Sequence, residues 1–377
     1  MVRERIIFLS AKNPFSTRDW SGIPYFMMQA LQREYEVEHL SAPSFNFLRN
    51  VGYYFGKLTN LLTGRKYIFD YGIILAWCYG RHYSGLLKRK DGYKFIFVPS
   101  GLSEIAFLNT KIPIISFGDC SILQLFNYYP SLNNVSRISS REVNFVEHRA
   151  FNKITVAFFS SSWASDFVRQ HFKMNGVGTI PFGCNLKQVA EISPKKLSQK
   201  ECNLLFVGVD WERKGGVVAL KILQALIEKK LEVRLTVIGC VPPSGSDLNH
   251  VRVIEKLDKD SAEGEREFVA ILNQTDFFIL PTLADCTPIV IAEAFSAGVP
   301  VLATNTGGIP SLVSEGVNGF MFALGDVQGY VQRIIQLIND PLQYEMISQN
   351  CIQSYSTTFN WQRWVEEFKR IAATHLN

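Results

Sequence analysis

Two acidic residues, Asp285 and Glu293, flank the predicted start of a helix in the second half of this 377-residue chain. Thr287 is followed by proline, and a threonine N-cap with proline at the first helical position is a typical helix start. The N–H groups of Ile289 and Val290 then have no partner within the helix. They lie at the positive end of its dipole, which stabilises an anion such as a phosphate. Because side chains lean toward the N-terminal end of a helix, Glu293 can accept hydrogen bonds from hydroxyls of the same ligand.

Two strands and a glycine-rich loop frame this predicted helix. The apolar runs Phe277–Leu280 and Val299–Ala303 are short and continuous, which is typical of buried strands in a parallel sheet. After the second strand, Gly307 and Gly308 form a flexible loop that leads into another helix. Spacing alone leaves two interpretations open: a phosphate-binding turn, or an ordinary βαβ unit in which the two acids are solvated.

The order of the residues that follow resembles a known enzyme signature. The run Glu293–Thr304 reads EAFSAGVPVLAT, and it is followed by Gly307-Gly308 and by Gly316–Gly319, which reads GVNG. This series resembles the pattern E-A-x-A-x-G-x-P-V-x-A-T, G-G and G-x-N-G of retaining glycosyltransferases of family 4, which have the GT-B fold. In that pattern another glutamate stands eight positions before the first one shown, and here Asp285 takes its place.

A second glycine-containing loop carries two positive charges. It follows the predicted strand Asn203–Gly208, and in it Arg213 and Lys214 precede Gly215-Gly216. Arginine and lysine beside such a loop supply the fixed positive charge that a diphosphate needs. The loop is similar to the family pattern F-V-G-R-x-x-x-K-G, with Val209 where arginine is common. The alternative is an exposed basic turn without a ligand.

The first half of the chain contains two further candidates near the ends of predicted strands. Gly22 lies between the predicted strand Arg5–Ser10 and a helix that extends to about Glu34, so it is a second candidate anion site and resembles the family's N-terminal G-G-I loop. Asp119 follows the predicted strand Ile112–Phe117, and ligands in open α/β sheets gather at such strand ends. Many family members have a histidine near this point and this chain does not. Asp119 is therefore a candidate for contact with the sugar or acceptor, and a helix cap is the equal alternative.

Strand and helix patterns alternate along most of the chain, which predicts parallel sheets covered by helices. Further strands are predicted at Glu36–Leu40, Gly72–Ala76, Phe95–Val98, Ile154–Phe159, Val233–Gly239 and Val251–Ile254. With the resemblance, this predicts an α/β protein of the GT-B type, with two Rossmann-like domains facing each other across a cleft. Residues 1–185 form the predicted acceptor-side domain and residues 186–357 the nucleotide-sugar domain. A C-terminal helix within residues 358–377 returns to the first domain, and the polar, lysine-rich residues 187–202 are expected to be a linker.

Composition and charge narrow the class of protein. A hydrophobic fraction of 47% and a charged fraction of 19% are typical of a globular protein. Residues 1–190 hold 22 Lys/Arg and 12 Asp/Glu, a net charge of +10, whereas residues 191–377 hold 17 and 22, a net charge of −5. The basic first half predicts an anionic partner, and a membrane surface suits it better than nucleic acid. Seven scattered cysteines and the lack of an apolar signal segment predict a cytoplasmic protein. The basic first half predicts that it is peripheral on the inner face of the membrane.

Residues 39–69 contain no Asp or Glu and are rich in aromatic and basic side chains. The simpler interpretation is a helix of the core with a basic, solvated edge. The alternative is an amphipathic helix that lies on an anionic membrane. The basic run Lys88–Lys90 follows in the same half of the chain.

The resemblance implies transfer of a sugar from a nucleotide-diphosphate donor to a hydroxyl of a glycan or lipid-linked acceptor, with retention at the anomeric carbon. It implies that Glu293 accepts from the ribose, that Asp285 accepts from the sugar, and that Lys214 with Arg213 neutralises the diphosphate. No metal or other cofactor is expected. The one Asp-x-Asp sequence, Asp258–Asp260, has a central lysine and mixed-charge surroundings that are typical of a solvated loop.

Two other classes of protein remain open. The departures from the family pattern, Asp285 and Val209 above all, also suit a non-catalytic module that binds sugar nucleotides or glycans. A nucleotide-sugar epimerase of the same fold would need catalytic carboxylates and a histidine, and the six histidines match no such pattern.

Overall fold

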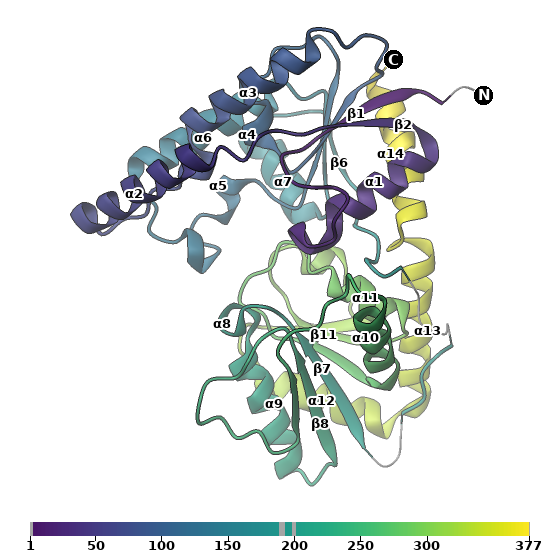
Figure 1. Ribbon diagram of the computed structural model, residues 1–377. Helices are drawn as coiled ribbons and strands as arrows, with labels where there is room; N and C mark the ends of the chain where they lie inside the picture. The colour runs from purple at the N-terminus through teal and green to yellow at the C-terminus, as the bar shows by residue number, and fades with distance from the viewer. Residues whose placement is uncertain (1–2, 188–192, 198–200, 377) are drawn as a thin grey trace. The chain divides into compact units, whose positions relative to one another are not determined.

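The computed structural model describes residues 3–187, 193–197 and 201–376, which form two compact units (Figure 1). Unit 1 comprises the described residues up to Ile180 together with those from Trp364 onward, and unit 2 extends from Pro181 to Arg363. The predicted linker at 187–202 includes residues 188–192 and 198–200, which lie outside the described residues.

Unit 1 contains a six-stranded sheet in the order β2-β1-β3-β4-β5-β6, with every neighbouring pair parallel. Its strands are short and largely apolar, as expected for a sheet covered on both faces. The strands are β1 (Arg5–Leu9), β2 (Glu36–Leu40), β3 (Ile96–Pro99), β4 (Ile114–Gly118), β5 (Val156–Phe159) and β6 (Val177–Thr179). The predicted parallel sheet is therefore confirmed.

Helices cover both faces of this sheet. One face packs against α3 (Ile73–Leu87), α4 (Leu102–Ile105), α6 (Arg137–Phe151) and α7 (Ser162–His171). The other faces α14 (Trp361–Leu376), whose Trp364 ring lies 5.1 Å from Phe117 and whose Phe368 ring lies 5.3 Å from Phe158. The C-terminal helix thus completes the core of unit 1, as predicted. The remaining helices of this unit are α1 (Ile23–Glu34), α2 (Asn46–Thr63) and α5 (Ile122–Leu125), with 3-10 turns η1 (Asp19–Gly22), η2 (Phe69–Tyr71) and η3 (Pro130–Leu132).

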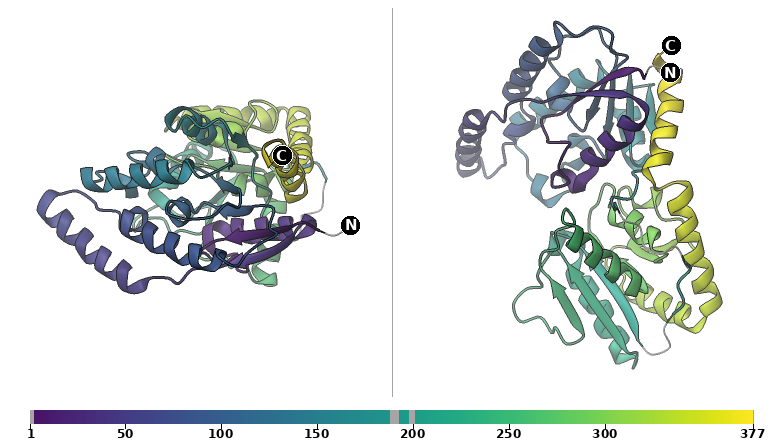
Figure 2. Two further views of the ribbon diagram at one scale, coloured as in Figure 1. Left: turned by 90° about the horizontal axis from the view of Figure 1, so that it is seen from above. Right: turned by 45° about the vertical axis from the view of Figure 1, so that its right-hand side comes forward.

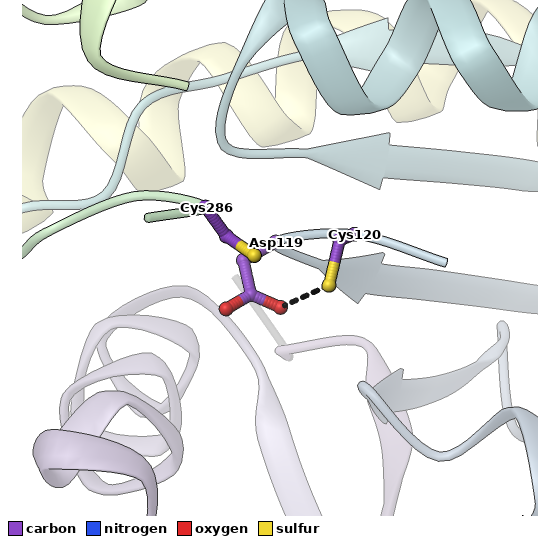
Figure 3. A group of neighbouring side chains, drawn as sticks. All are labelled: Asp119, Cys120 and Cys286. Carbon is purple, nitrogen blue, oxygen red and sulfur yellow. Dashed lines mark hydrogen bonds between the residues drawn. The ribbon is translucent and has the colours of Figure 1, made fainter. Parts of the chain in front are cut away.

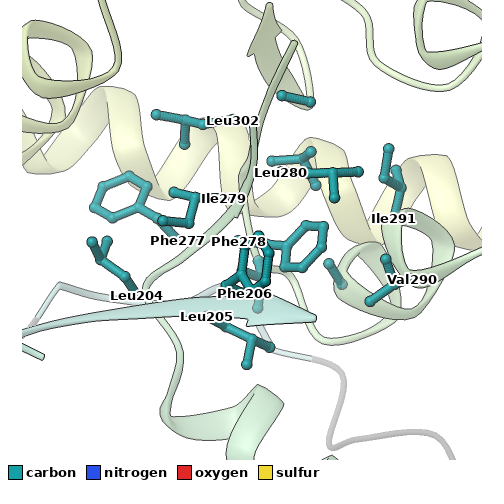
Figure 4. Packing of buried hydrophobic residues seen from close by; sticks show 14 of the residues in the cluster. Leu204, Leu205, Phe206, Phe277, Phe278, Ile279, Leu280, Val290, Ile291 and Leu302 are labelled. Carbon is teal, nitrogen blue, oxygen red and sulfur yellow. The ribbon is translucent and has the colours of Figure 1, made fainter. Parts of the chain in front are cut away.

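Unit 2 repeats this architecture with the sheet order β12-β11-β10-β7-β8-β9, again all parallel. Its strands are β7 (Cys202–Val207), β8 (Val233–Ile238), β9 (Val251–Ile254), β10 (Phe277–Leu280), β11 (Val301–Thr304) and β12 (Gly319–Phe322). Figure 4 shows side chains of β7 and β10 packed with Val290 and Ile291 in one buried cluster. The helices are α8 (Trp211–Lys214), α9 (Gly216–Glu228), α10 (Ala262–Gln274), α11 (Val290–Ser296), α12 (Val327–Asn339) and α13 (Pro341–Thr357), with the 3-10 turn η4 (Ile309–Ser311).

Each sheet has a point where the chain order reverses. In unit 1 it lies between β1 and β3, and in unit 2 between β7 and β10. Loops that leave adjacent strands in opposite directions part at such a point, and ligands of open α/β sheets bind there, outside the carboxyl ends of the strands. Ligand-binding residues are therefore expected in the loops after β1 and β3 and in those after β7 and β10.

The predicted strand Gly72–Ala76 is wrong, because this segment begins α3 instead. The buried side chains Leu75, Tyr79, Tyr83 and Leu87 recur at helical spacing over 15 residues. A window of five apolar residues cannot distinguish a buried strand from the first turn of a buried helix.

The interpretation of residues 39–69 as a core helix is also wrong. This segment contains α2, and Gly52 is the single buried residue of that helix. Gly52 rests on Phe69, because a Cβ added there would lie 2.0 Å from the Phe69 ring. Figures 1 and 2 show α2 at the margin of unit 1, outside the helices that pack on the sheet. Among the described helices, none has the length and apolarity needed to cross a bilayer.

Candidate functional site

The loops after β7 and β10 lie against each other at the reversal point of unit 2. Gly215 has φ of +80°, which favours glycine, and a Cβ there would lie 1.9 Å from the Pro281 carbonyl oxygen. At Gly208, which follows β7, a Cβ would lie 2.6 Å from Cγ of Lys214. The two glycines therefore allow the basic loop to pack over the end of β7 and beside the loop that carries Asp285.

Asp285 is the centre of a buried charge cluster. Its Oδ2 lies 2.5 Å from Lys214 Nζ and 3.9 Å from Nη1 of Arg213, and the exposed fractions of these three side chains are 8%, 11% and 14%. Arg213 is fixed further, since Nη1 donates to the Ala284 carbonyl oxygen at 2.8 Å and Nε lies 3.4 Å from Asp210. The structure thus brings three of the residues singled out in the sequence into direct contact.

The Gly307-Gly308 loop reaches the same place. Gly308 N–H donates to the backbone carbonyl oxygen of Asp285 at 3.2 Å. This hydrogen bond ties the loop after β11 to the loop after β10. The loops after β7, β10 and β11 therefore converge around the cluster at Asp285.

The helix that follows begins later than predicted. It extends from Val290 to Ser296, and its N-cap is Ile289, which lacks a side-chain oxygen. Thr287 lies two residues too early to cap it, so its predicted role as N-cap is wrong. A tight turn precedes the helix instead: Ile291 N–H donates to the Pro288 carbonyl oxygen at 3.1 Å, which is the i→i+3 pattern of a 3-10 turn.

Glu293 projects from α11 and is fully buried. Its Oε1 accepts a hydrogen bond from Lys259 Nζ at 2.6 Å. Its Oε2 is buried and has no hydrogen-bond partner in the described part of the chain. Buried polar atoms in proteins are nearly always paired, so an orphaned carboxylate oxygen calls for an explanation. A ligand hydroxyl is the simplest group that would satisfy it.

Lys259 is a functional candidate that sequence reasoning missed. It lies in the loop between β9 and α10, and that loop was expected to be solvated. Asp258 is exposed as expected, but the Lys259 side chain is only 34% exposed and reaches inward to Glu293. No local pattern links two residues 34 positions apart. The one available signal was that a buried glutamate needs a cation.

Replacing Lys259 with methionine is expected to lower the free energy of unfolding by about 1–3 kcal/mol, because both oxygens of the buried Glu293 carboxylate would then lack a partner. Urea unfolding of the wild type and the variant measures this loss. Adding Glu293→Gln to the variant should recover part of it, since a neutral amide costs less to bury than an unpaired charge. Lys256→Met, at an exposed position of the same loop, is the control. Equal midpoints for Lys259→Met and Lys256→Met would show that the ion pair contributes nothing.

Unit 1 contains a cavity of about 480 Å³ at its own reversal point. The walls come from the ends of β1, β3 and β4 and from α2, α3 and α6, and they include Lys12, Arg49, Tyr79 and Glu104. Both charge signs and tyrosine are present, which suits a polar ligand with several hydroxyls. Of these residues, Lys12, Tyr79 and Glu104 were not predicted to contact a ligand.

Two buried glutamates support the walls of this cavity. Glu104 accepts from Ala11 N–H at 2.9 Å and from Tyr83 Oη at 3.1 Å, and burial raises its pKa to about 7. Glu147 accepts from the hydroxyl of Ser121 at 2.6 Å and from the N–H of Ile122 at 2.7 Å, and burial also raises its pKa to about 7. Their hydrogen bonds hold loops, so both act first as structural groups.

Asp119 lies beside the cavity, at the end of β4. It accepts from Trp20 Nε1 at 3.2 Å and from the Cys120 thiol at 3.5 Å, and burial raises its pKa. Figure 3 shows the Cys120 sulfur directed at this carboxylate; Cys286, also drawn, belongs to unit 2. Trp20, Ser21 and Gly22 have φ of 47°, 54° and 81°, and strained backbone of this kind clusters at functional sites. Asp119 therefore holds the Gly22 loop in place.

Comparison with known proteins agrees with this arrangement. Residues 201–340 match the family described as glycosyl transferases group 1. D-inositol 3-phosphate glycosyltransferase of Corynebacterium urealyticum is 27% identical over 172 residues, which are 43% of this chain and 40% of that protein. UDP-Gal:alpha-D-GlcNAc-diphosphoundecaprenol alpha-1,3-galactosyltransferase of Escherichia coli is 25% identical over 209 residues, 51% of this chain and 53% of that protein. The chain thus covers about half of the length of these relatives.

The fold also has close counterparts among solved structures. Sucrose-phosphate synthase from Thermosynechococcus elongatus aligns with a TM-score of 0.68 and 15% identity over 99% of both chains. At that level of sequence identity, the alignment supports a shared fold and not a shared function. Asp285, Glu293, Lys214 and Arg213 all fall within the segment that matches the family. Residues 201–340 therefore match the glycosyl transferases group 1 family, and the chain has the GT-B fold.

Proposed function

We propose that this protein is a retaining, metal-independent glycosyltransferase that moves a hexosyl group from a nucleotide-diphosphate sugar to a hydroxyl of a glycan or lipid-linked acceptor. One observation carries the proposal. Asp285, Lys214 and Arg213 form a buried charge cluster at the reversal point of unit 2, and a carboxylate oxygen of Glu293 in the same unit is buried without a partner among the described residues. Burying these charges costs desolvation free energy, and the binding of a charged ligand would explain why the cluster is present.

Each of the candidate site residues of unit 2 has a proposed role in holding the donor. Glu293 accepts from the ribose hydroxyls through Oε2, while Lys259 keeps the carboxylate in position through Oε1. Lys214 and Arg213 neutralise the diphosphate. Asp285 accepts from a hydroxyl of the sugar and at the same time orients Lys214. The donor phosphates lie among backbone groups near Gly208, Thr287, Ile289, Val290, Gly307 and Gly308.

The chemistry follows from where charge develops. The bond between the anomeric carbon and the diphosphate oxygen breaks, so negative charge grows on the diphosphate as it leaves. Fixed cations placed at that position stabilise the transition state more than the ground state. The acceptor hydroxyl attacks from the face that the diphosphate leaves, and the departing phosphate takes its proton, which gives retention. Because Lys214 and Arg213 supply the positive charge, we propose no metal.

Unit 1 is proposed to hold the acceptor in its cavity. Asp119 lies at the cavity's edge and is proposed to contact the acceptor or the transferred sugar, directly or by positioning the Gly22 loop, whose N–H groups remain a candidate anion contact. The Escherichia coli relative is named for a UDP-sugar donor and a diphosphoundecaprenol-linked acceptor. UDP-sugars and lipid-linked glycans are therefore the first substrates to test. We further propose a cytoplasmic protein, peripheral on the anionic inner face of a membrane.

The donor is best identified by thermal shift with UDP, GDP, ADP and dTDP, because a ligand that binds only the folded state stabilises it by about 2.7 kcal/mol at one hundred times its Kd. One nucleoside diphosphate should raise the melting temperature clearly more than its monophosphate. Mass analysis with the matching nucleotide sugar should then show release of the diphosphate. Binding without release would favour a non-catalytic module, and no shift with any nucleotide would contradict the proposal.

A further inference from the structure

The outer side of α2 is an apolar surface on unit 1 that the proposed donor site does not use. Its large hydrophobic side chains are exposed by half or more, with exposed fractions of 78% for Phe47, 83% for Leu61 and 73% for Leu62. Isolated hydrophobic residues on a surface need no explanation, but a contiguous set marks an interaction site. The residues of this stripe are Phe47, Val51, Tyr54, Leu58, Leu61 and Leu62.

The spacing places these residues on one side of the helix. Phe47, Val51, Tyr54, Leu58 and Leu61 are separated by four, three, four and three positions, which is the period of a single helical face. The opposite side holds glycine instead: Gly52 rests on the Phe69 ring, and a Cβ at Gly56 would lie 3.3 Å from the Tyr67 carbonyl oxygen.

This distribution is the reverse of what a helix of the core requires. A core helix turns its large apolar side chains inward and its small or polar residues outward. Here Gly52 and Gly56 face the protein and the apolar stripe faces away from it, while Leu48 and Phe55 are partly turned toward the protein. The sequence of α2 is therefore adapted to a partner outside the chain.

Charge identifies the class of partner. No acid occurs between residues 39 and 69. Lys57 and Arg65 are exposed, and Lys57 Nζ lies 4.6 Å from the centre of the Tyr53 ring. Two other basic residues of this segment, Arg49 and Lys66, are engaged within unit 1. Arg49 donates to Tyr79 and pairs with Asp70 at 3.2 Å. Lys66 donates to backbone carbonyl oxygens of the 130–131 segment. Arg49 and Lys66 are exposed but engaged in this way, so Lys57 and Arg65 are the exposed basic residues that this segment offers to a partner.

A second copy of the chain is a poor match for this surface. A 4-3-4-3 stripe can form a coiled coil, but pairs of helices in coiled coils are selected by opposite charges beside the stripe. Pairing α2 with itself would bring basic residues together without any acid to offset them. An anionic bilayer offers both an apolar interior and a negative surface, and tyrosine and lysine beside an apolar face suit its interface.

We infer that α2 lies in the plane of an anionic membrane, with its apolar stripe inserted among the lipids and Lys57 and Arg65 at the headgroups. The helix has 18 residues, so about 27 Å of its length would contact the surface. Only the purpose of membrane binding rests on the proposed function: it would keep unit 1 beside a lipid-linked acceptor. The surface itself is independent of the donor site in unit 2.

Co-sedimentation of the whole protein with vesicles tests the inference. The wild type should sediment with phosphatidylglycerol-containing vesicles at low salt and far less with phosphatidylcholine alone, and added salt should release part of it. Changing Phe47, Leu61 and Leu62 together to serine should lower the partition coefficient at least about tenfold, because each buried side chain of this size contributes strongly to transfer from water. Lys57→Gln with Arg65→Gln should lower it at least about fivefold at low salt.

Matched controls separate this surface from general stickiness and from the donor site. Leu324, Leu342 and Met346 are exposed apolar residues of unit 2, with exposed fractions of 62%, 81% and 54%, and changing them together to serine should leave vesicle binding unchanged. Cleavage of a soluble donor should stay at the wild-type rate in the α2 variants, so a failure of membrane binding and a failure of the proposed transfer are distinguishable.

Three results would overturn the inference. The wild type would ignore anionic vesicles at low salt, or bind neutral ones equally well. The α2 triple variant would bind as the wild type does. Sedimentation equilibrium would show a dimer that the same triple variant dissociates, in which case a second copy covers the stripe.

Discussion

Replacing Lys214 with alanine is expected to slow cleavage of the nucleotide-sugar donor at least about tenfold, which corresponds to about 1.4 kcal/mol of activation barrier. The charge of Lys214 is held 2.5 Å from Asp285 in a largely buried site. Removing it takes away a cation aimed at the departing diphosphate and leaves Asp285 with Arg213 as its remaining cation among the pairs described, at 3.9 Å. Both effects oppose the growth of negative charge in the transition state. The turnover number at saturating donor is the quantity to measure.

Two further variants show whether the position of the charge matters. Arg213→Ala should slow turnover less, because the Arg213 guanidinium is already engaged by Ala284 and Asp210. Lys221→Ala, at an exposed position of α9, should leave turnover unchanged. An inactive Arg213 variant beside a fully active Lys214 variant would reverse the assignment of the principal cation.

Glu293→Gln is expected to weaken donor binding by about 1–3 kcal/mol, because a charged acceptor for the ribose hydroxyls is lost. The substitution keeps the shape of the side chain, and Lys259 is one-third exposed, so its ammonium group can turn to water when the ion pair is gone. Titration calorimetry with the nucleoside diphosphate selected by thermal shift measures the loss.

The same variant distinguishes the ribose from the diphosphate as the partner of Glu293. Affinity for the nucleoside diphosphate should fall in Glu293→Gln, while inhibition by inorganic pyrophosphate should stay close to the wild-type value. Equal losses for both ligands would place the effect on the diphosphate or on the fold. Unchanged binding and turnover would remove Glu293 from the site.

Much of the fold was predictable because the strands carry strong local signals. The predicted bounds of β2, β9 and β10 agree with those of the structure, and the continuous apolar run of β10 is the clearest of these signals. The errors arose where a local pattern had two physical explanations. Gly72–Ala76 is apolar enough for a strand, and only the spacing of Tyr79, Tyr83 and Leu87 beyond it reveals the helix.

The candidate site was predictable where a motif orders its residues along the chain. Lys214 and Asp285 are 71 positions apart, yet the glycine loop and the acidic position were each recognisable, and the structure brings them together. Lys259 was missed because its importance comes from one contact with a buried carboxylate, and sequence spacing does not encode it. The cavity of unit 1 was missed for a similar reason, since its walls come from many elements that are far apart in the sequence.

The exposure of α2 could not be decided from its sequence. An amphipathic helix has the same periodicity whether its apolar side faces the core or a partner outside the chain. The side of α2 that faces the protein is identified by the contact of Gly52 with Phe69, and the sequence does not show that contact.

Sugar transfer with retention is the central claim, and proton NMR of donor turnover tests it most directly. The wild-type protein would be incubated with the α-linked nucleotide sugars of the nucleoside diphosphate chosen by thermal shift, and the anomeric proton of the released or transferred sugar would be followed from the first minutes. We expect the free nucleoside diphosphate to appear together with an α-configured product, with Lys214→Ala at least about tenfold slower. A β-configured first product, an epimerised donor that keeps its nucleotide, or a donor that binds and stays intact would each contradict the account.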